Sequence, residues 1–303
     1  MLAGKIFLVT GATGRLGSAL TARLEELGAS VLPLVLNGYP SRPHSVSWTA
    51  RTLPLVITNA TGLTGLPSPD AVINLHWKVD RTRTDTEQLL HELDLNVHQP
   101  GFLWDWLKSR EPTRFINVSS INIFSHLNQG PVNARTEPRP ASPYGIAKFA
   151  AEKFFDARFS GGRTSVTHLR LCSVCSYGEH PSQLVSRLAA STFQRKSFTL
   201  HTGHRVSLMY IDEAIDTLIN AALTAISGPH LAVTPSQTVE EVASLFQSLS
   251  GLPLHVERRD LTPNIQEIEY ASDLDRLRAP WVRVTPLAQA LTLIMKQWPS
   301  SVH

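Results

Sequence analysis

The chain has 303 residues, of which 42% are hydrophobic and 17% charged. These proportions are typical of a globular protein and exclude a generally disordered chain. Lys and Arg total 28 against 25 Asp and Glu, and this formal charge of +3 gives no electrostatic reason to expect nucleic acid or a membrane as partner. With two cysteines, no signal-peptide pattern and no apolar run of about 20 residues, we expect a cytoplasmic protein from a reducing compartment.

Over the first 120 residues, short β-branched runs alternate with amphipathic stretches, a rhythm that predicts a parallel sheet covered by helices. We predict helices over Leu16–Leu27 and Thr86–Ser109. The predicted strands are Lys5–Thr10, Ser30–Leu36, Leu55–Thr58, Ala71–Leu75, Arg114–Ser119 and Thr167–Leu171.

After Tyr177 the rhythm breaks into shorter pieces rich in Pro, His and Ser. We therefore predict an α/β Rossmann domain, a doubly wound parallel sheet, with a small discontinuous C-terminal substrate lobe over its carboxyl edge. The expected domain comprises residues 1–176 and about 206–235, and the lobe residues 177–205 and 236–303.

A glycine turn, Gly11-Ala12-Thr13-Gly14-Arg15-Leu16-Gly17, follows the first predicted strand and opens the first predicted helix. Glycines at such a turn allow a tight bend, close approach of the backbone to a pyrophosphate and close helix packing. The helix N-terminus offers unpaired N–H groups and a positive dipole end to phosphates. We therefore predict a nicotinamide dinucleotide site whose contacts at this turn are Gly11, Thr13, Gly14, Arg15, Leu16 and Gly17, with Asn37 and Arg42 after the second predicted strand.

The segment after the second predicted strand bears on the choice of dinucleotide. An acidic residue normally binds the ribose hydroxyls of NAD about 20 positions beyond the glycines; here Asn37 holds that place, and no Asp or Glu occurs between Glu26 and Asp70. Arg42 and Arg51 lie in this stretch, and arginine suits a 2′-phosphate. The pattern favours NADP(H), and NAD(H) remains open.

Three polar residues predict proton-transfer chemistry. Ser120 follows a strand, and Tyr144 and Lys148 lie four residues apart on an expected helix, so their side chains share one face. An unperturbed tyrosine, with a pKa of about 10, is a poor base at neutral pH. A neighbouring ammonium favours the phenolate and would let Tyr144 exchange a proton with an alcohol or ketone, while Ser120 orients the same oxygen.

The glycine turn, the serine strand Val118-Ser119-Ser120 and the Tyr144/Lys148 pair together resemble the extended short-chain dehydrogenase/reductases, specifically the NAD-dependent epimerase/dehydratase group that acts on nucleotide sugars. The resemblance implies catalytic roles for Ser120, Tyr144 and Lys148, with Asn96 supporting Lys148 through water. It also implies that Leu75, His76, Tyr144 and Lys148 bind the cofactor. It also implies a homodimer formed through two long helices per subunit.

The same resemblance extends to the substrate side. Arg205, ahead of Tyr210-Ile211-Asp212-Glu213, and Arg259, ahead of Asp260, are similar to the arginines that bind a nucleotide diphosphate in that group. With Ser120 they are the expected substrate-binding residues, and the expected partner is a nucleotide sugar.

The departures from the group narrow the reaction. Dehydratases of the group carry Asp-Glu directly after the catalytic serine or threonine, and C3/C5 epimerising members carry a cysteine there, whereas this chain has Ile121-Asn122. His76 and Trp77 replace two small residues beside the expected cofactor. The favoured function is hydride reduction of a keto-sugar with Tyr144 as proton donor; the alternatives are an NAD-dependent 4-epimerase, a reductase of a non-sugar carbonyl and a non-catalytic NAD(P)-sensing protein.

Cys172 and Cys175 form one Cys-x-x-Cys pair with no second pair in the sequence. Zinc requires about four ligands, so we expect buried thiols and no metal.

Overall fold

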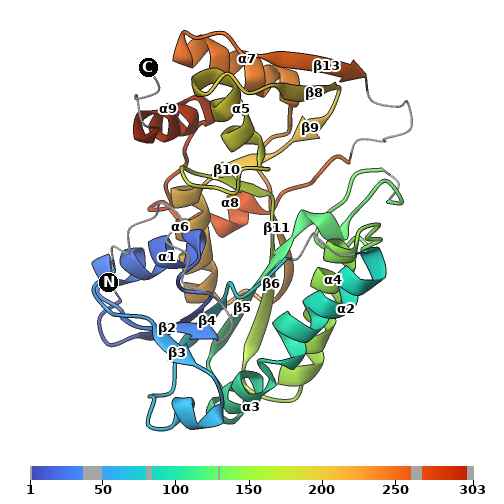
Figure 1. Ribbon diagram of the computed structural model, residues 1–303. Helices are drawn as coiled ribbons and strands as arrows, with labels where there is room; N and C mark the ends of the chain where they lie inside the picture. The colour runs from blue at the N-terminus through green and yellow to red at the C-terminus, as the bar shows by residue number, and fades with distance from the viewer. Residues whose placement is uncertain (1, 37–49, 80–83, 129, 261–267, 299–303) are drawn as a thin grey trace.

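The computed structural model describes residues 2–36, 50–79, 84–128, 130–260 and 268–298. At its centre is a parallel sheet in the order β11-β6-β5-β4-β1-β2-β3 (Figure 1). The order reverses between β1 and β4, which confirms the predicted doubly wound fold. In folds of this kind, ligands bind at the carboxyl ends of the two strands where the order reverses. The strands are β1 (Ile6–Thr10), β2 (Ser30–Leu36), β3 (Leu55–Ile57), β4 (Ala71–Asn74), β5 (Arg114–Ser120), β6 (Ser165–Leu171) and β11 (Gly228–Ala232).

Helices cover both faces of this sheet and bury two separate apolar cores. Successive residues of β1 alternate between them: Phe7 and Val9 pack on one side, Leu8 on the other, as the period of two in a strand requires. The Phe7 side is covered by α1 (Arg15–Glu26) and α6 (Ile211–Leu223); the Leu8 side is covered by α3 (Gly101–Arg110) and α4 (Pro143–Phe159), with α2 (Asp85–Leu93) packed along α4.

The helix predicted over Thr86–Ser109 is wrong as a single element. The structure has α2, then a π-turn (Asp94–His98), and α3 starts afresh at Gly101. Pro100 lies at the break, where its missing N–H and its ring interrupt the helical ladder. The π-turn buries the side chain of Asn96.

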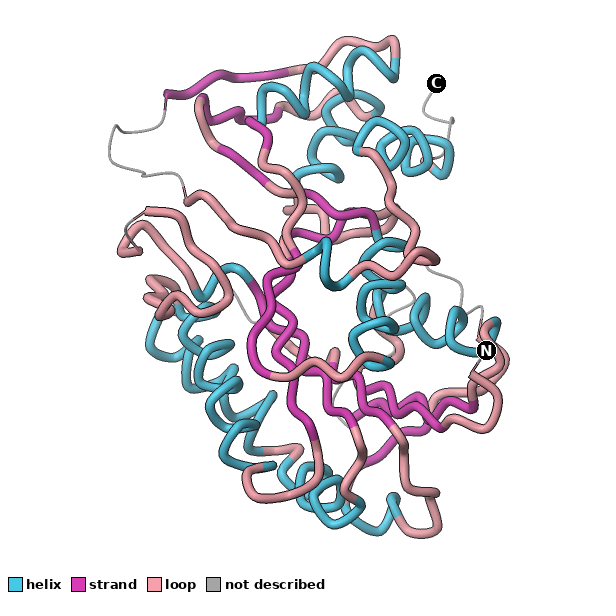
Figure 2. The backbone as a smooth tube through the Cα atoms, turned by 180° about the vertical axis from the view of Figure 1, so that it is seen from behind, coloured by secondary structure: helices cyan, strands magenta, loops and turns pink. Residues whose placement is uncertain are grey.

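A second group of elements lies beyond the carboxyl ends of the strands. The chain enters it where β6 continues almost directly into β7 (Ser173–Cys175), which pairs with β10 (Leu208–Tyr210). Helices α5, α7 and α9 gather there in both views of the chain (Figures 1 and 2), and the Phe7-side core continues into them through Leu188, Phe246 and Ile294. The elements are β7 (Ser173–Cys175), α5 (Leu184–Phe193), β8 (Phe198–Thr202), β9 (Arg205–Val206), β10 (Leu208–Tyr210), β12 (Gln237–Thr238), α7 (Val239–Ser250), β13 (Val256–Asp260), α8 (Leu274–Leu277) and α9 (Leu287–Gln297).

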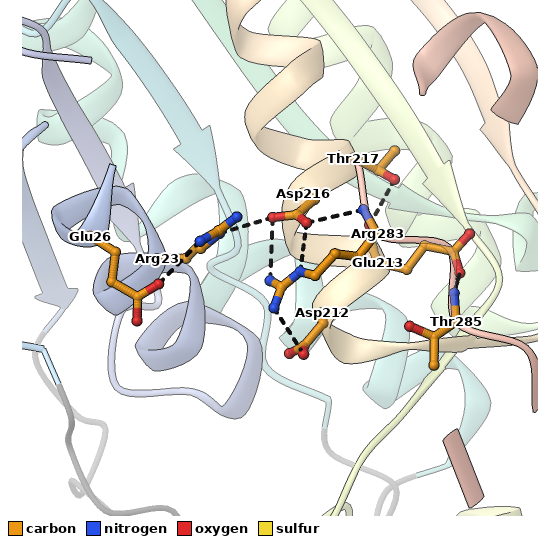
Figure 3. A network of polar contacts seen from close by, with 8 residues as sticks. All are labelled: Arg23, Glu26, Asp212, Glu213, Asp216, Thr217, Arg283 and Thr285. Carbon is orange, nitrogen blue, oxygen red and sulfur yellow. Dashed lines mark hydrogen bonds and ion pairs between the residues drawn. The ribbon is translucent and has the colours of Figure 1, made fainter. Parts of the chain in front are cut away.

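A charged network fastens α1 and the segment before α9 to helix α6 (Figure 3). The fully buried carboxylate of Asp216 accepts hydrogen bonds from Nε of Arg23 at 3.1 Å and from Nε of Arg283 at 2.8 Å. Asp212, one turn earlier and partly exposed, accepts from Nη1 of Arg283 at 3.2 Å. Asp216 therefore joins its own helix to two segments that are distant in sequence, α1 and the segment around Arg283.

Helices α2 and α4 also carry apolar side chains on their outer surfaces. Leu90 is 63% exposed and Ile146 is 39% exposed. Among the described helices, none is both long enough and apolar enough to cross a membrane.

Candidate active site

The glycine turn between β1 and α1 is shaped by two close backbone approaches. Gly11 has φ +64°, and a Cβ there would lie 2.9 Å from the carbonyl oxygen of Leu75 at the end of β4. A Cβ on Gly17 would lie 2.3 Å from the carbonyl oxygen of Gly11. These positions accept only glycine, which fixes the turn against the end of β4.

The N-terminus of α1 fits a phosphate group. Its N-cap is the exposed Gly14, which offers no side-chain cap, and the first turn holds no acidic residue. The first backbone N–H groups of the helix therefore have no cap and no carboxylate from its own first turn to compete with an anion. Thr13 and Leu16 lie on the same turn, both half-buried.

Arg15 links this turn to the segment after β7. Its Nη2 donates to the carbonyl oxygen of Val174 at 3.1 Å, and its Nη1 lies 3.6 Å from Oε2 of Glu179. Burial lowers the pKa of Arg15 and raises that of Glu179, and the attraction between the two charges opposes both shifts. Arg15 thus places a positive charge in the first turn of α1 and is itself held by the segment that includes Val174 and Glu179.

Two of the predicted cofactor residues, Asn37 and Arg42, lie outside the described residues. Arg51 is described, and its backbone N–H donates to the carboxylate of Glu25 at 2.5 Å. The NADP(H) preference therefore stays a prediction.

His76, directly after Leu75, is buried and uncharged near neutral pH. Its backbone N–H donates to Oγ1 of Thr10 at 3.1 Å, and its Nε2 lies 3.2 Å from the carbonyl oxygen of Leu95. Burial lowers the pKa of His76 to about 4, and the nearby positive charge of Lys148 acts in the same direction. The side chain thus ties the ends of β1 and β4 to the π-turn.

Helix α4, which carries Tyr144 and Lys148, contacts the carboxyl end of β5 close to Ser120. Nζ of Lys148 donates to the carbonyl oxygen of Val118 at 2.9 Å, two residues before Ser120. Asn122 lies two residues beyond Ser120, and its carbonyl oxygen would be only 2.2 Å from a Cβ added to Gly145. Helix α4 is thus held against β5 on both sides of Ser120.

Tyr144 and Lys148 share one face of α4. Nζ of Lys148 lies 5.8 Å from the centroid of the Tyr144 ring. Lys148 is 5% exposed, and burial lowers its pKa to about 7, while the carboxylates of Glu92 and Glu152 act to raise it. An ammonium that titrates near neutral pH beside a phenol is suited to proton exchange.

Asn96 makes its side-chain hydrogen bonds to backbone groups. Its Oδ1 accepts from the N–H of Lys78 at 2.6 Å, and its Nδ2 donates to the carbonyl oxygens of Lys78 at 2.9 Å and Glu92 at 2.7 Å. These bonds join the loop after β4 to α2. The expected water-mediated support of Lys148 stays a prediction.

The two arginines expected to bind the substrate differ in their surroundings: among the described residues, Arg205 lines a cavity, and Arg259 does not. Arg205 is exposed on β9 and donates to Oγ and to the carbonyl oxygen of Ser236. It lines a cavity of about 610 Å³ beside Tyr270, whose ring lies 6.4 Å from that of Phe124. Arg259, on β13, is not among the described residues that line this cavity, and its Nη2 lies 4.0 Å from Oε2 of Glu257.

Three residues with clear structural importance were not singled out from the sequence for the roles they have here. Gly145 permits the contact of α4 with Asn122, Trp77 packs on Lys148, and the fully buried Glu92 binds Trp77. The glycine directly after Tyr144 could have indicated the close contact at Gly145. The roles of Trp77 and Glu92 depend on contacts between segments that the sequence does not pair.

Cys172 and Cys175 are both buried and unpaired with each other. Burial raises the pKa of both thiols, that of Cys175 to about 12. Neither thiol is suited to act as a nucleophile at neutral pH.

Comparison with known proteins agrees with this geometry. The family model described as "NAD dependent epimerase/dehydratase family" matches residues 7–233. A search of curated protein sequences finds no match.

Solved structures share the fold at low sequence identity. MoeE5 in complex with UDP-glucuronic acid and NAD is 21% identical with a TM-score of 0.79, over 97% of this chain and 98% of that one. UDP-glucose 4-epimerase of Thermotoga maritima is 17% identical with a TM-score of 0.81 over the same shares. RMD from Pseudomonas aeruginosa, complexed with NADPH, is 17% identical with a TM-score of 0.75, again over 97% and 98%.

Proposed function

The chain belongs to the NAD-dependent epimerase/dehydratase family, and from this membership we propose that it is an NAD(P)-dependent oxidoreductase that reduces a keto group of a nucleotide-linked sugar. The observation that carries the proposal is that helix α4 holds Tyr144 and Lys148 on one face and contacts the end of β5 at Val118 and Asn122, on either side of Ser120. A phenol, an ammonium and a hydroxyl in this arrangement suit the interconversion of an alcohol and a ketone.

The glycine turn, the N-terminus of α1 and Arg15 would hold the dinucleotide pyrophosphate, because they offer backbone N–H groups and a positive charge. When bound, the nicotinamide supplies the hydride. Tyr144 donates the proton to the carbonyl oxygen of the substrate, and Ser120 donates a hydrogen bond that orients the same oxygen. The Lys148 ammonium stabilises the phenolate that remains on Tyr144.

Support for the substrate class comes from Arg205 and from the similar structures. Arg205 faces a cavity large enough for part of a ligand, and a guanidinium binds diphosphate oxygens in pairs. Two of the similar structures are described with UDP-linked sugars. We extend that substrate class to this chain as part of the proposal.

Calorimetric titration of the cofactor-free protein with NADPH and with NADH is the first test. We expect NADPH to bind at least tenfold more tightly, a difference of about 1.4 kcal/mol. Tyr144→Phe should then keep cofactor affinity and lose turnover of keto-sugars, measured as consumption of the reduced nicotinamide. Binding of neither dinucleotide would refute the proposal.

A 4-epimerase is the second candidate, favoured by the similarity to UDP-glucose 4-epimerase. An epimerase returns the hydride to the same substrate and so keeps its cofactor. Protein purified with NAD bound, and interconversion of two sugar epimers without net consumption of cofactor, would select this function. A non-catalytic sensor would instead bind the dinucleotide and show the same cellular function with Tyr144→Phe.

A further inference from the structure

Trp77, in the loop after β4, lies directly on the predicted proton-transfer pair. Nζ of Lys148 is 4.0 Å from the centroid of the indole ring. The Tyr144 ring meets the same indole at a centroid distance of 6.3 Å and an interplanar angle of 88°. One aromatic side chain therefore contacts both residues.

The indole is itself held in place from helix α2. Its Nε1 donates to Oε2 of Glu92 at 3.2 Å, and Nε2 of Gln88 donates to Oε1 of the same carboxylate at 2.7 Å. Glu92 is fully buried, and a buried polar group needs hydrogen-bond partners to replace the water it has lost. Gln88, Glu92 and Trp77 thus form a connected support that ends at Lys148.

Lys148 needs this support because its surroundings exclude water. Among the described residues, the titratable groups that act on it or contact it are Glu92 from α2, Glu152 and Tyr144 from its own helix, and His76 on the loop after β4. Burial lowers the pKa of His76 to about 4, so this imidazole adds no second positive charge at pH 7. An aromatic face attracts an ammonium most strongly where water is absent.

We propose that Trp77 is a positioning residue of the reaction centre: its indole face holds the Lys148 ammonium beside Tyr144, and Glu92 fixes the indole. This proposal deepens the proposed function and rests on it, because a reaction centre presupposes that the site is catalytic. The geometry of the contacts is independent of the substrate.

The test is the pH titration of Lys148 followed by NMR in protein with ¹³Cε-labelled lysine, with the resonance assigned by its loss in Lys148→Arg. Trp77→Leu keeps an apolar side chain but removes the aromatic face, and Trp77→Phe keeps a ring without the indole N–H. We expect Trp77→Leu to lower the titration midpoint of Lys148 by about one pH unit and Trp77→Phe to lower it by less than half as much. Glu92→Gln should also lower it, because it removes a facing negative charge.

Lys153 provides the internal control. It lies five residues along the same helix, with Nζ 5.2 Å from the Phe149 ring, and its midpoint should stay unchanged in all three variants. An unchanged Lys148 midpoint in Trp77→Leu, or equal shifts in Trp77→Leu and Trp77→Phe, would overturn the proposal. Because the titration needs neither cofactor nor substrate, failure of the dinucleotide to bind would count against the proposed function and leave this result standing.

Discussion

Gly145→Ala tests whether the contact between helix α4 and the end of β5 organises the site. The added Cβ would lie 2.2 Å from the carbonyl oxygen of Asn122 and 3.1 Å from Cβ of Pro140. An ordinary van der Waals distance requires α4 and the turn to separate by about 1 Å. Neither neighbour is the flexible end of a side chain, so the backbone must move.

The cost follows from the same geometry. Overpacking of this kind destabilises by about 1–3 kcal/mol, and the better helix propensity of alanine returns less than about 1 kcal/mol. We therefore expect a net loss of about 1–2 kcal/mol, seen as a thermal midpoint lower by about 2–8 °C. Because the displaced residue is next to Tyr144, turnover should fall about 100-fold, the effect of a misplacement of about 1 Å at a reacting group.

Gly101→Ala is the matched control. Gly101 also lies in the first turn of a helix, and a Cβ there would meet no atom within 4 Å. This variant should be at least as stable as the parent protein and fully active. Equal midpoints and equal turnover for Gly145→Ala and Gly101→Ala would refute the close contact and the reasoning built on it.

Three further predictions concern charge, pH and assembly. Asp216→Asn should cost about 2–3 kcal/mol in urea unfolding, because it removes the buried charge shared by two arginines that still reach water, whereas Asp212→Asn at the partly exposed end of the network should cost less than about 1 kcal/mol; equal losses would contradict this. Because the pKa of His76 is lower in the folded protein than in the unfolded chain, the unfolded chain takes up the imidazole proton at a higher pH. The free energy of unfolding should therefore fall as the pH drops from 6.5 toward 4, by up to about 3 kcal/mol. His76→Gln should flatten that part of the pH–stability curve, and an unchanged slope would count against a buried neutral imidazole. If the exposed Leu90 lies in a homodimer interface, light scattering should find a dimer for the parent protein and a monomer for Leu90→Glu; a dimer in both would exclude this face.

The sheet could be predicted from the sequence because parallel strands are buried on both faces and form short continuous apolar runs. The runs at Ser30–Leu36 and Ala71–Asn74 are strands within a residue of their predicted ends. The seventh strand, Gly228–Ala232, was missed because it starts with Gly-Pro-His and contains no β-branched residue. The break at Pro100 was visible in the sequence, but helical apolar spacing on both sides outweighed it.

The candidate site could be predicted only where its chemistry is local in sequence. Tyr144 and Lys148 lie one turn apart, and such a pair can be found from spacing alone. The contact of Trp77 with Lys148 joins residues far apart in the chain, and it depends on how the loop after β4 folds over α4. Periodicity carries no information on contacts between distant segments. The sequence therefore showed that Trp77 is a large side chain beside the expected cofactor, but it could not show that Trp77 contacts Lys148.

The segments after β1 and β4 carry the same physical arrangement. After β1, Arg15 meets the buried carboxylate of Glu179; after β4, Trp77 donates to the buried carboxylate of Glu92. Removing one member of such a pair takes a partner away from a buried carboxylate, which costs more than the pair itself contributes. Trp77→Ala combined with Glu92→Leu should accordingly be more stable than Trp77→Ala alone, because the double variant leaves no buried carboxylate short of a hydrogen-bond donor.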